Sequence, residues 1–395
     1  MPKIHLRKGH VQPVWAGHPW IFAQAVRSVE GAPAPGDVVG VHDPRGNFLG
    51  KGFYSPKSAI AVRILSRDPD ETLNGGFIAR RLERASAWRR SLLGLPDAQN
   101  TGYRLAHAEG DGLAGLVVDV FGEVAVVQLL TIGMKRLQND IFTHIARVAG
   151  AKTVIEIGHR VQKLEGFEVE RRIVRGKEID ALRFLERGLE ISIPFGLDQK
   201  TGYYFDQREN RATAGRLSKG RRVLDAFSYV GGFALAAARG GASEVICLDS
   251  SAPAIAAGAA IARHNGLADS IEHRRGDAKR ELVAMQKRGE RFDMVIIDPP
   301  KLIPTIRHIE AGRGAYRKLN ANAMRLVEPG GLLLSCSCSG AFAQDDFLRM
   351  LGYAARDAGR EASLLHASGQ APDHPSPPAF PDGRYLKFAV LRVDR

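Results

Sequence analysis

The pattern of hydrophobic positions changes near residue 220 of this 395-residue chain. Beyond that point the apolar runs RVLDAF, EVICLD, FDMVIID and GLLLSCS alternate with stretches typical of helices, such as GGFALAAARG and APAIAAGAAIARHNGL. Continuous apolar strands separated by helices predict a parallel sheet that is covered on both faces. We therefore expect a doubly wound α/β domain whose ligand binds at the carboxyl ends of the strands.

The N-terminal half shows shorter and more varied patterns. Residues 1–70 carry short apolar runs such as DVVGVHD and AIAVRIL between glycines and prolines, which predicts a small β domain. Residues 75–95 are expected to form a helix, GDGLAGLVVDVFGEVAVVQLL a hairpin, and a helix near 134–149 is followed by the strand TVIEIG. Together they predict a compact α+β module over about 75–190, and residues 189–206 are expected to form further strands.

The charge balance suggests a polyanionic partner. Lys and Arg total 56 against 43 Asp and Glu, a formal net charge of +13. Such an excess favours nucleic acid, and the alternative is a basic protein with no such partner. Five arginines between Arg80 and Arg90 either track phosphates or form a solvated helix face. Trp15, Trp20 and Phe22 either stack on bases or, the interpretation we favour, fill a small core.

The cysteines and the N-terminus exclude several classes of protein. Cys247, Cys336 and Cys338 are too few for a disulfide framework and lack histidines at the spacing of a zinc site. The N-terminal segment MPKIHLRKGH has no apolar signal-peptide core, and no run approaches the ~20 apolar residues needed to span a bilayer. We expect a cytoplasmic protein without a metal site or a membrane partner.

Two acidic residues follow neighbouring strands of the predicted sheet. Asp225 closes the first strand, and the turn after it leads to Gly231 and Gly232, which allow a ligand to approach the backbone closely. Asp249 closes the next strand, where an acid can accept hydrogen bonds from the two hydroxyls of a ribose. A nucleoside-bearing cofactor is the ligand that this pair predicts.

Two further acidic residues extend the pattern. Asp277, in RRGDAKR, either borders an adenine or caps the following helix. The sequence Asp298-Pro299-Pro300-Lys301 follows FDMVII, and its prolines make a rigid loop that can hold a planar base beside a methyl donor. The phosphate-binding motif G-x-x-x-x-G-K-[ST] and the deaminase motif P-C-x-x-C are absent. We therefore favour S-adenosylmethionine over NAD or ATP.

The fourth strand carries two thiols in LLLSCSCSG. Alternation places Cys336 and Cys338 on the same face of the strand, with Cys338 nearer its carboxyl end. Cys338 is the candidate nucleophile, and an inert buried cysteine is the alternative. Cys247 is expected in the core. The cation of Lys301 is expected to lower the pKa of the Cys338 thiol.

Motifs along almost the whole chain occur in the order seen in one family. GHPWIF, GDGLAGLVVD, GLDQKTGYYFDQRENR, DAFSYVGGFAL, IDPPKL, SCSCSG and the closing DHP and FPDGRYLKF resemble the bacterial 23S ribosomal RNA 5-methylcytosine methyltransferases. The resemblance implies a β-barrel PUA domain over 1–72, a central α+β module over 73–188 and a Rossmann-like methyltransferase domain over 189–395. It assigns the catalytic thiol to Cys338.

The resemblance also implies a site and a reaction. It implies that Lys200, Tyr203 and Asp206 lie near the cofactor or the target base, although a scaffold of strand and turn is the alternative. We expect catalysis by Cys338, Asp298 and Lys301. The residues expected to bind S-adenosylmethionine are Lys200, Tyr203, Asp206, Asp225, Phe227, Ser228, Gly231, Gly232, Asp249, Asp277, Ala278, Asp298 and Pro299.

The expected reaction is methylation of C5 of a cytosine in 23S ribosomal RNA. Carbon 5 of a pyrimidine is a poor nucleophile, so a thiolate must first add to C6, which makes Cys338 necessary. One alternative is methylation of an exocyclic amine, which needs no thiol, and another is a noncatalytic RNA-binding assembly factor. A homodimer is a further expectation.

Overall fold

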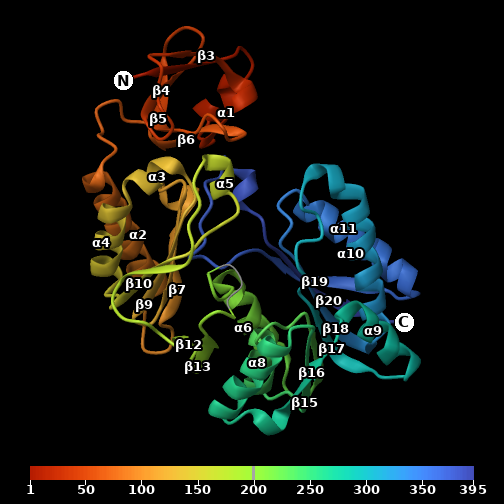
Figure 1. Ribbon diagram of the computed structural model, residues 1–395. Coiled ribbons are helices and arrows are strands. Elements are labelled where there is room, and N and C mark those ends of the chain that lie inside the picture. The colour runs from red at the N-terminus through yellow and green to blue at the C-terminus, as the bar shows by residue number, and fades with distance from the viewer. Residues whose placement is uncertain (198–200) are drawn as a thin grey trace. The chain divides into compact units, whose positions relative to one another are not determined.

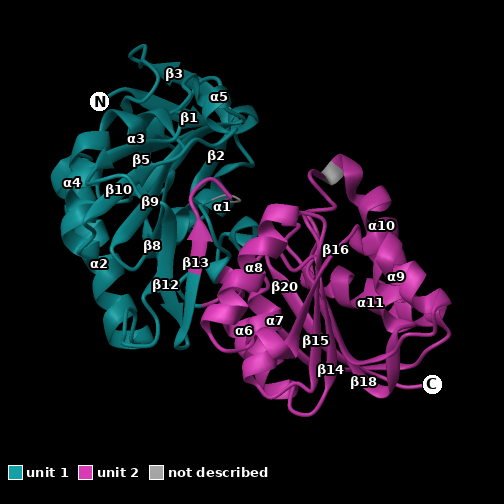
Figure 2. Cartoon of the chain, turned by 60° about the horizontal axis from the view of Figure 1, so that its bottom comes forward, with its two compact units in different colours: residues 1–191, 198–205, 372–383 teal, residues 192–197, 206–371, 384–395 magenta. Residues whose placement is uncertain are grey.

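The chain divides into two compact units. The computed structural model describes residues 1–197 and 201–395 (Figure 1). Unit 1 comprises Met1–Ile191, Asp198–Phe205 and Pro372–Gly383, and unit 2 comprises Ser192–Leu197, Asp206–Ala371 and Arg384–Arg395 (Figure 2). Among the helices of the described residues, none is both long and apolar enough to cross a membrane.

Unit 1 begins with a six-stranded sheet in the order β2-β6-β5-β4-β1-β3. Its pairs are antiparallel except for β1 with β4. This sheet confirms the predicted β domain. The bounds are β1 Lys3–Leu6, α1 Val11–Trp15, β2 Trp20–Phe22, β3 Val26–Glu30, β4 Val38–His42, β5 Phe48–Tyr54 and β6 Ile60–Ser66.

The aromatic residues of VWAGHPWIF do not fill the core of this sheet, so that prediction is wrong. Trp15 is 75% exposed and Phe22 is 37% exposed. Trp20 is half-buried, donates through Nε1 to Glu109 at 2.7 Å and packs its ring 4.7 Å from that of Phe380. The core consists instead of aliphatic side chains that alternate along the strands, because one face of each strand is covered.

The second sheet of unit 1 has the order β11-β10-β9-β8-β7. The predicted hairpin is present as β8 and β9, which pair in antiparallel fashion, and the predicted helix over 75–95 is α2. Asn74 caps α2 by accepting from the Phe77 amide at 3.1 Å. The bounds are α2 Gly75–Leu93, β7 Gly102–His107, β8 Leu116–Phe121, β9 Val124–Leu129, α3 Ile132–Arg136, α4 Gln138–Ala149, β10 Thr153–Glu156, α5 Gln162–Glu165 and β11 Arg172–Arg175.

The next segment is less regular than the sequence predicts. β12 Ala181–Glu186 and β13 Leu189–Pro194 pair with each other, but the described residues beyond Pro194 include no strand before residue 222. Phe205–Gln207 instead form a turn of 3-10 helix. The expectation of strands over 189–206 is therefore correct only for the first part of that range. Gly196 and Gly202, whose φ values of 106° and 132° suit glycine, favour turns over a strand.

Unit 2 is built on a seven-stranded sheet in the order β16-β15-β14-β17-β18-β20-β19. The neighbouring strands β16, β15, β14, β17 and β18 are parallel, as predicted. Strand β20 runs antiparallel to both of its neighbours, β18 and β19. The bounds are α6 Arg208–Leu217, β14 Arg222–Ala226, α7 Gly232–Arg239, β15 Glu244–Asp249, α8 Ala252–His264, β16 Ile271–Arg275, α9 Ala278–Lys287, β17 Phe292–Ile297, α10 Ile309–Met324, β18 Val327–Ser337, α11 Gln344–Ala358, β19 Ala362–Ser368 and β20 Lys387–Val393.

Helices cover both faces of this sheet. Figure 2 shows α6, α7 and α8 on one side and α9, α10 and α11 on the other. The largest core of the unit joins apolar residues of the sheet with those of α9, α10 and α11. Because both faces are covered, the central strands are apolar throughout, which explains the continuous runs in the sequence. The predicted doubly wound α/β fold is confirmed.

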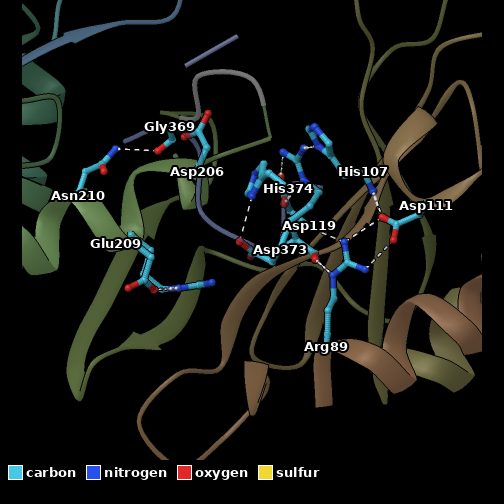
Figure 3. Close-up of polar contacts among 12 residues, drawn as sticks. Arg89, His107, Asp111, Asp119, Asp206, Glu209, Asn210, Gly369, Asp373 and His374 are labelled. Atoms are coloured by element: carbon cyan, nitrogen blue, oxygen red, sulfur yellow. Dashed lines mark hydrogen bonds and ion pairs between the residues drawn. The ribbon is translucent and has the colours of Figure 1, made fainter. Parts of the chain in front are cut away.

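A buried ionic network holds unit 1 together (Figure 3). The Arg89 guanidinium is fully buried, donates to the Asp111 carboxylate at 2.9 and 2.8 Å, and donates to the Asp373 carbonyl at 2.8 Å. Asp373 accepts from the Arg104 amide at 2.9 Å and pairs with His374 at 3.1 Å. The network therefore ties the segment Pro372–Gly383 to α2 and β7, and it removes Arg89 from any exposed arginine stripe.

We predict that Arg89→Met lowers the free energy of unfolding of unit 1 by about 3–5 kcal/mol, because the Asp111 carboxylate would stay buried without its cationic partner. Urea unfolding measures this change. Arg84→Met, at an exposed position of the same helix, is the control and should change stability by less than about 0.5 kcal/mol. An Arg89→Met protein as stable as the wild type would contradict the role of the network.

Candidate active site

The strand order of unit 2 brings the predicted polar residues to one edge of the sheet. β14 lies between β15 and β17, and these strands run parallel, so their carboxyl ends meet at the same edge. Asp225 lies near the end of β14, Asp249 ends β15, Asp298 follows β17 and Cys338 follows β18. The strand order reverses between the neighbouring strands β14 and β17, and this reversal marks the usual ligand site of such sheets.

The loop between β14 and α7 has an unusual backbone. Phe227 and Tyr229 adopt left-handed conformations with φ of 64° and 53°, and Gly231 has φ of 80°. For residues with a Cβ this conformation costs on the order of 1–3 kcal/mol and is held only by surrounding contacts. The Ser228 amide donates to the Leu248 carbonyl at 3.1 Å, and the Gly231 amide donates to the Ser228 carbonyl at 2.8 Å. A loop fixed in this way is typical of a ligand site.

Asp225 is fully buried beneath that loop. Its Oδ2 accepts from the Ala234 amide at 3.0 Å, which attaches the first turn of α7 to β14. Its Oδ1 is buried without a hydrogen-bond partner in the described part of the chain. Burial raises the pKa of Asp225 to about 8, the Ala234 amide opposes this change, and the charges of Asp298 and Asp249 add to it.

Asp249 presents a carboxylate at the end of β15. Its Oδ2 accepts from the Tyr229 amide at 2.9 Å and its Oδ1 accepts from the Ser251 amide at 2.8 Å. Each carboxylate oxygen has a second lone pair, so the group can also accept from two hydroxyls. Asp249 thus holds the strained loop and keeps the capacity to bind a ribose.

Asp277 caps α9. Its Oδ1 accepts from the Arg280 amide at 3.0 Å, with Ala278 as the first residue of the helix. The capping interpretation of this residue is therefore confirmed. Asp277 is exposed and Ala278 is buried, and contact of either residue with an adenine stays a prediction.

Asp298 is held from a segment that is distant in sequence. Gln207 donates through Nε2 to Asp298 Oδ2 at 3.0 Å, and Gln207 Oε1 accepts from Asn210 at 2.6 Å. Asn210 also donates to the Gly369 carbonyl at 3.2 Å (Figure 3). Pro299, the next residue, is buried. The Asp298 carboxylate is therefore fixed in direction.

The three cysteines occupy different environments. Cys247 and Cys336 are fully buried, whereas Cys338 is half-buried. Burial raises the pKa of the Cys247 thiol, and burial raises that of Cys336 well above its usual value, with Asp298 adding to the effect. Cys247 lies in the core as predicted. Of the three cysteines, Cys338 is the one that is partly exposed.

Two lysines belong to this end of unit 2. Lys301 is exposed on the loop after β17. Lys387, at the start of β20, is 2% exposed and donates through Nζ to the carbonyls of Ser339 and Tyr385 at 2.5 and 2.8 Å. Burial lowers the pKa of Lys387 to about 8, with Cys338 acting in the opposite direction and Lys301 in the same direction.

The candidate site residues of GLDQKTGYYFDQ do not all belong to the same unit. Tyr203 is buried in unit 1, where its ring lies 5.0 Å from that of Phe184. Asp206 is buried in unit 2, where it accepts from Tyr385 Oη at 2.7 Å. Lys200 lies outside the described residues. Roles of these three residues at the cofactor stay predictions.

Sequence reasoning missed Gln207, Asn210 and Lys387. Gln207 and Asn210 occur in DQRENR, where nothing in the local pattern separates them from an ordinary polar helix start. Lys387 lies within the motif FPDGRYLKF, and no role was predicted for it. A lysine before the apolar run FAVL, at the start of a buried strand, was the available signal.

The residues present fit S-adenosylmethionine. The fixed loop over 227–231, the buried Asp225 oxygen without a partner and the Asp249 carboxylate offer polar groups to a nucleoside and an amino acid group. A ribose hydroxyl pair matches an acid at the end of the second strand of the domain.

Comparisons with known proteins agree with this geometry. A PUA-like domain matches residues 4–67, and the S-adenosylmethionine-dependent methyltransferase family matches residues 105–389. Proteins named ribosomal RNA large subunit methyltransferase I are 37% identical to this chain in Shewanella denitrificans and 36% in Erwinia tasmaniensis, with 99% of each chain covered.

The fold has solved counterparts. A putative SAM-dependent methyltransferase from Streptococcus mutans has a TM-score of 0.85 at 18% identity, with 99% of this chain and 100% of that chain covered. A further structure, SMU.776, is a putative methyltransferase complexed with SAH, with a TM-score of 0.86 at 18% identity and the same coverage. With an N-terminal PUA-like domain and full-length relatives of this kind, the chain belongs to the S-adenosylmethionine-dependent methyltransferase family, in the group of the ribosomal RNA large subunit methyltransferases I.

Proposed function

We propose that this chain methylates C5 of a cytosine in 23S ribosomal RNA through a covalent adduct on Cys338. The observation that carries the proposal is the half-buried Cys338 thiol at the edge of the sheet that also carries Asp225, Asp249 and Asp298. The two other thiols are fully buried. The relatives' name supplies the class of substrate.

In the proposed mechanism the Cys338 thiolate adds to C6 of the cytosine, and the electron pair of the C5–C6 double bond becomes available at C5. When bound, S-adenosylmethionine supplies the methyl group that C5 takes up. A base then removes the C5 proton, and the returning electron pair expels the Cys338 thiolate. Asp298, held by Gln207, accepts a hydrogen bond from the amine of the cytosine and orients the ring.

Cofactor binding is proposed for the loop and the acids around it. Phe227, Ser228, Gly231 and Gly232 line the turn, Asp249 binds the ribose, and Asp277 with Ala278 borders the adenine. Pro299 supports the loop beside the methyl group. Lys200, Tyr203 and Asp206 complete the proposed set.

RNA binding is proposed for the N-terminal part of the chain. Residues 1–72 form the proposed PUA domain, residues 73–188 the central module and residues 189–395 the methyltransferase domain. Arg80, which pairs with Glu71 at 3.2 Å, and Arg84 are exposed on α2, and we propose that their charges bind phosphates. A target inside a helix must be extruded from the stack. A homodimer and a cytoplasmic location belong to the same proposal.

We predict that Asp249→Ala weakens S-adenosylmethionine binding by roughly 1–3 kcal/mol, because the charge-assisted hydrogen bonds to the ribose are removed. Titration calorimetry measures the affinity. Asp269→Ala, which removes an exposed acid outside the site, is the control and should bind as the wild type does. Unchanged affinity in a folded Asp249→Ala protein would remove Asp249 from the site.

Replacing the thiol tests the chemistry. Cys338→Ala should abolish methyl transfer to ribosomal RNA while leaving cofactor affinity unchanged, because the substitution removes only the nucleophile. RNA that carries 5-fluorocytosine should trap an adduct with the wild type and with Cys336→Ala, since fluorine cannot leave as the C5 proton does. If Cys338→Ala remains active, mass analysis of the digested nucleosides decides between Cys336 as nucleophile and an N-methylated product.

The exposed arginines of α2 should contribute to RNA affinity through their charge alone. Arg80→Gln together with Arg84→Gln should weaken RNA binding and reduce the slope of log affinity against log salt by roughly 1 for each phosphate that the helix no longer binds. Filter binding over a range of salt concentrations measures the slope. Arg356→Gln, at an exposed position of α11, is the control. An unchanged slope in the double variant would show that this helix does not bind RNA.

A further inference from the structure

Lys387 is a buried lysine with no carboxylate partner among the described residues. Its side chain is 2% exposed, and its two hydrogen bonds go to the carbonyls of Ser339 and Tyr385. In the described ranges no carboxylate forms an ion pair with it. Buried lysines are rare because desolvation of an ammonium is expensive, and neutral carbonyls compensate only part of that cost. An anionic group close to its ammonium would explain why a lysine is buried here.

The register of the sheet places Lys387 beside the thiol. Lys387 pairs with Ser337, the last residue of β18, and its Nζ binds the carbonyl of Ser339. These two residues flank Cys338 in the chain. Lys387 therefore holds the backbone on either side of Cys338. It also brings a positive charge close to the Cys338 thiol.

We propose that Lys387 is a positioning residue for Cys338, and that its ammonium holds this thiol as the thiolate before RNA binds. The inference deepens the proposed function and rests on Cys338 as the nucleophile. The proton leaves Sγ for bulk water, the ammonium keeps its own three protons, and no redox change takes place. On addition of the sulfur to C6 the negative charge leaves the thiolate, so Lys387 stabilises the free enzyme in its reactive form.

The other titratable groups around this pair come from several elements. Cys336 lies two residues before Cys338, and Tyr316 of α10 contacts Ser339 Oγ at 3.1 Å. Burial raises the pKa of Tyr316, and Cys338 adds to this effect, so the phenol stays neutral when the thiol ionises. Lys301 is the second cation, but it is exposed and its field is screened by solvent. Among the described residues of this end of unit 2, Lys387 is thus a buried cation that acts on Cys338 without such screening.

The test removes the charge of Lys387 while keeping a hydrogen-bond donor at that position. Lys387→Gln retains an N–H donor for the carbonyl of Ser339, and Lys387→Arg retains the charge. Alkylation of Cys338 by iodoacetamide is followed by peptide mass analysis over the neutral and alkaline pH range, on the full-length protein without RNA. Because Cys247 and Cys336 are fully buried, the modified peptide reports on Cys338.

We expect Lys387→Gln to move the midpoint of the alkylation profile to higher pH and to slow alkylation at neutral pH by about tenfold, since the thiol loses its neighbouring charge. Methyl transfer by this variant should recover as the pH rises, and Lys387→Arg should restore the neutral-pH rate. A purely structural role would produce no such recovery. Arg392→Gln, which removes an exposed cation of the same strand, should leave the profile unchanged.

Three outcomes would overturn the inference. The first is an unchanged midpoint in Lys387→Gln, and the second is an equal shift in Arg392→Gln. The third needs no variant: a wild-type midpoint at or above the ordinary thiol value of about 8.5 would show that nothing stabilises the thiolate. If Cys338→Ala retains methyl transfer, the nucleophile proposal fails whatever the alkylation profile shows. If Cys338→Ala is inactive and the profile does not move, only the role of Lys387 fails.

Discussion

The site depends on the parallel order of β14, β15, β17 and β18. Parallel strands end at the same edge, so residues that are far apart in sequence, such as Asp225 and Cys338, come to one side of the sheet without any local signal that joins them. The reversal of strand order between β14 and β17 opens the position where a ligand can approach the strand ends. The helices on both faces keep this arrangement rigid by burying the sheet.

At the carboxyl ends of these strands, burial gives residues of the same type different properties. Asp225 is enclosed and its pKa is raised to about 8, whereas Asp249 accepts from two backbone amides at the rim. The cysteines divide in the same way, because Cys247 and Cys336 lie inside the strands and Cys338 lies just beyond the end of β18. A short displacement along the chain thus separates an inert thiol from an accessible one.

The loop after β14 shows how the fold stabilises an unfavourable backbone. Phe227 and Tyr229 are left-handed although each has a side chain, and the hydrogen bonds from Ser228 to Leu248 and from Tyr229 to Asp249 hold them. The same Asp249 carboxylate is the proposed partner of the ribose. The loop conformation and the proposed ribose contact therefore depend on the same side chain.

The sequence by itself determined the doubly wound domain, the β domain before it, and the acids at the strand ends. These features follow from continuous apolar runs and from the polar residue that ends each run, both of which are local properties of the chain. Only the tertiary structure decided that Gln207 holds Asp298, that Lys387 lies beside Cys338, and that Trp15 and Phe22 are exposed. Hydrogen bonds between residues some 50 to 90 positions apart, and the burial of one side chain by another element, depend on packing that no local pattern encodes.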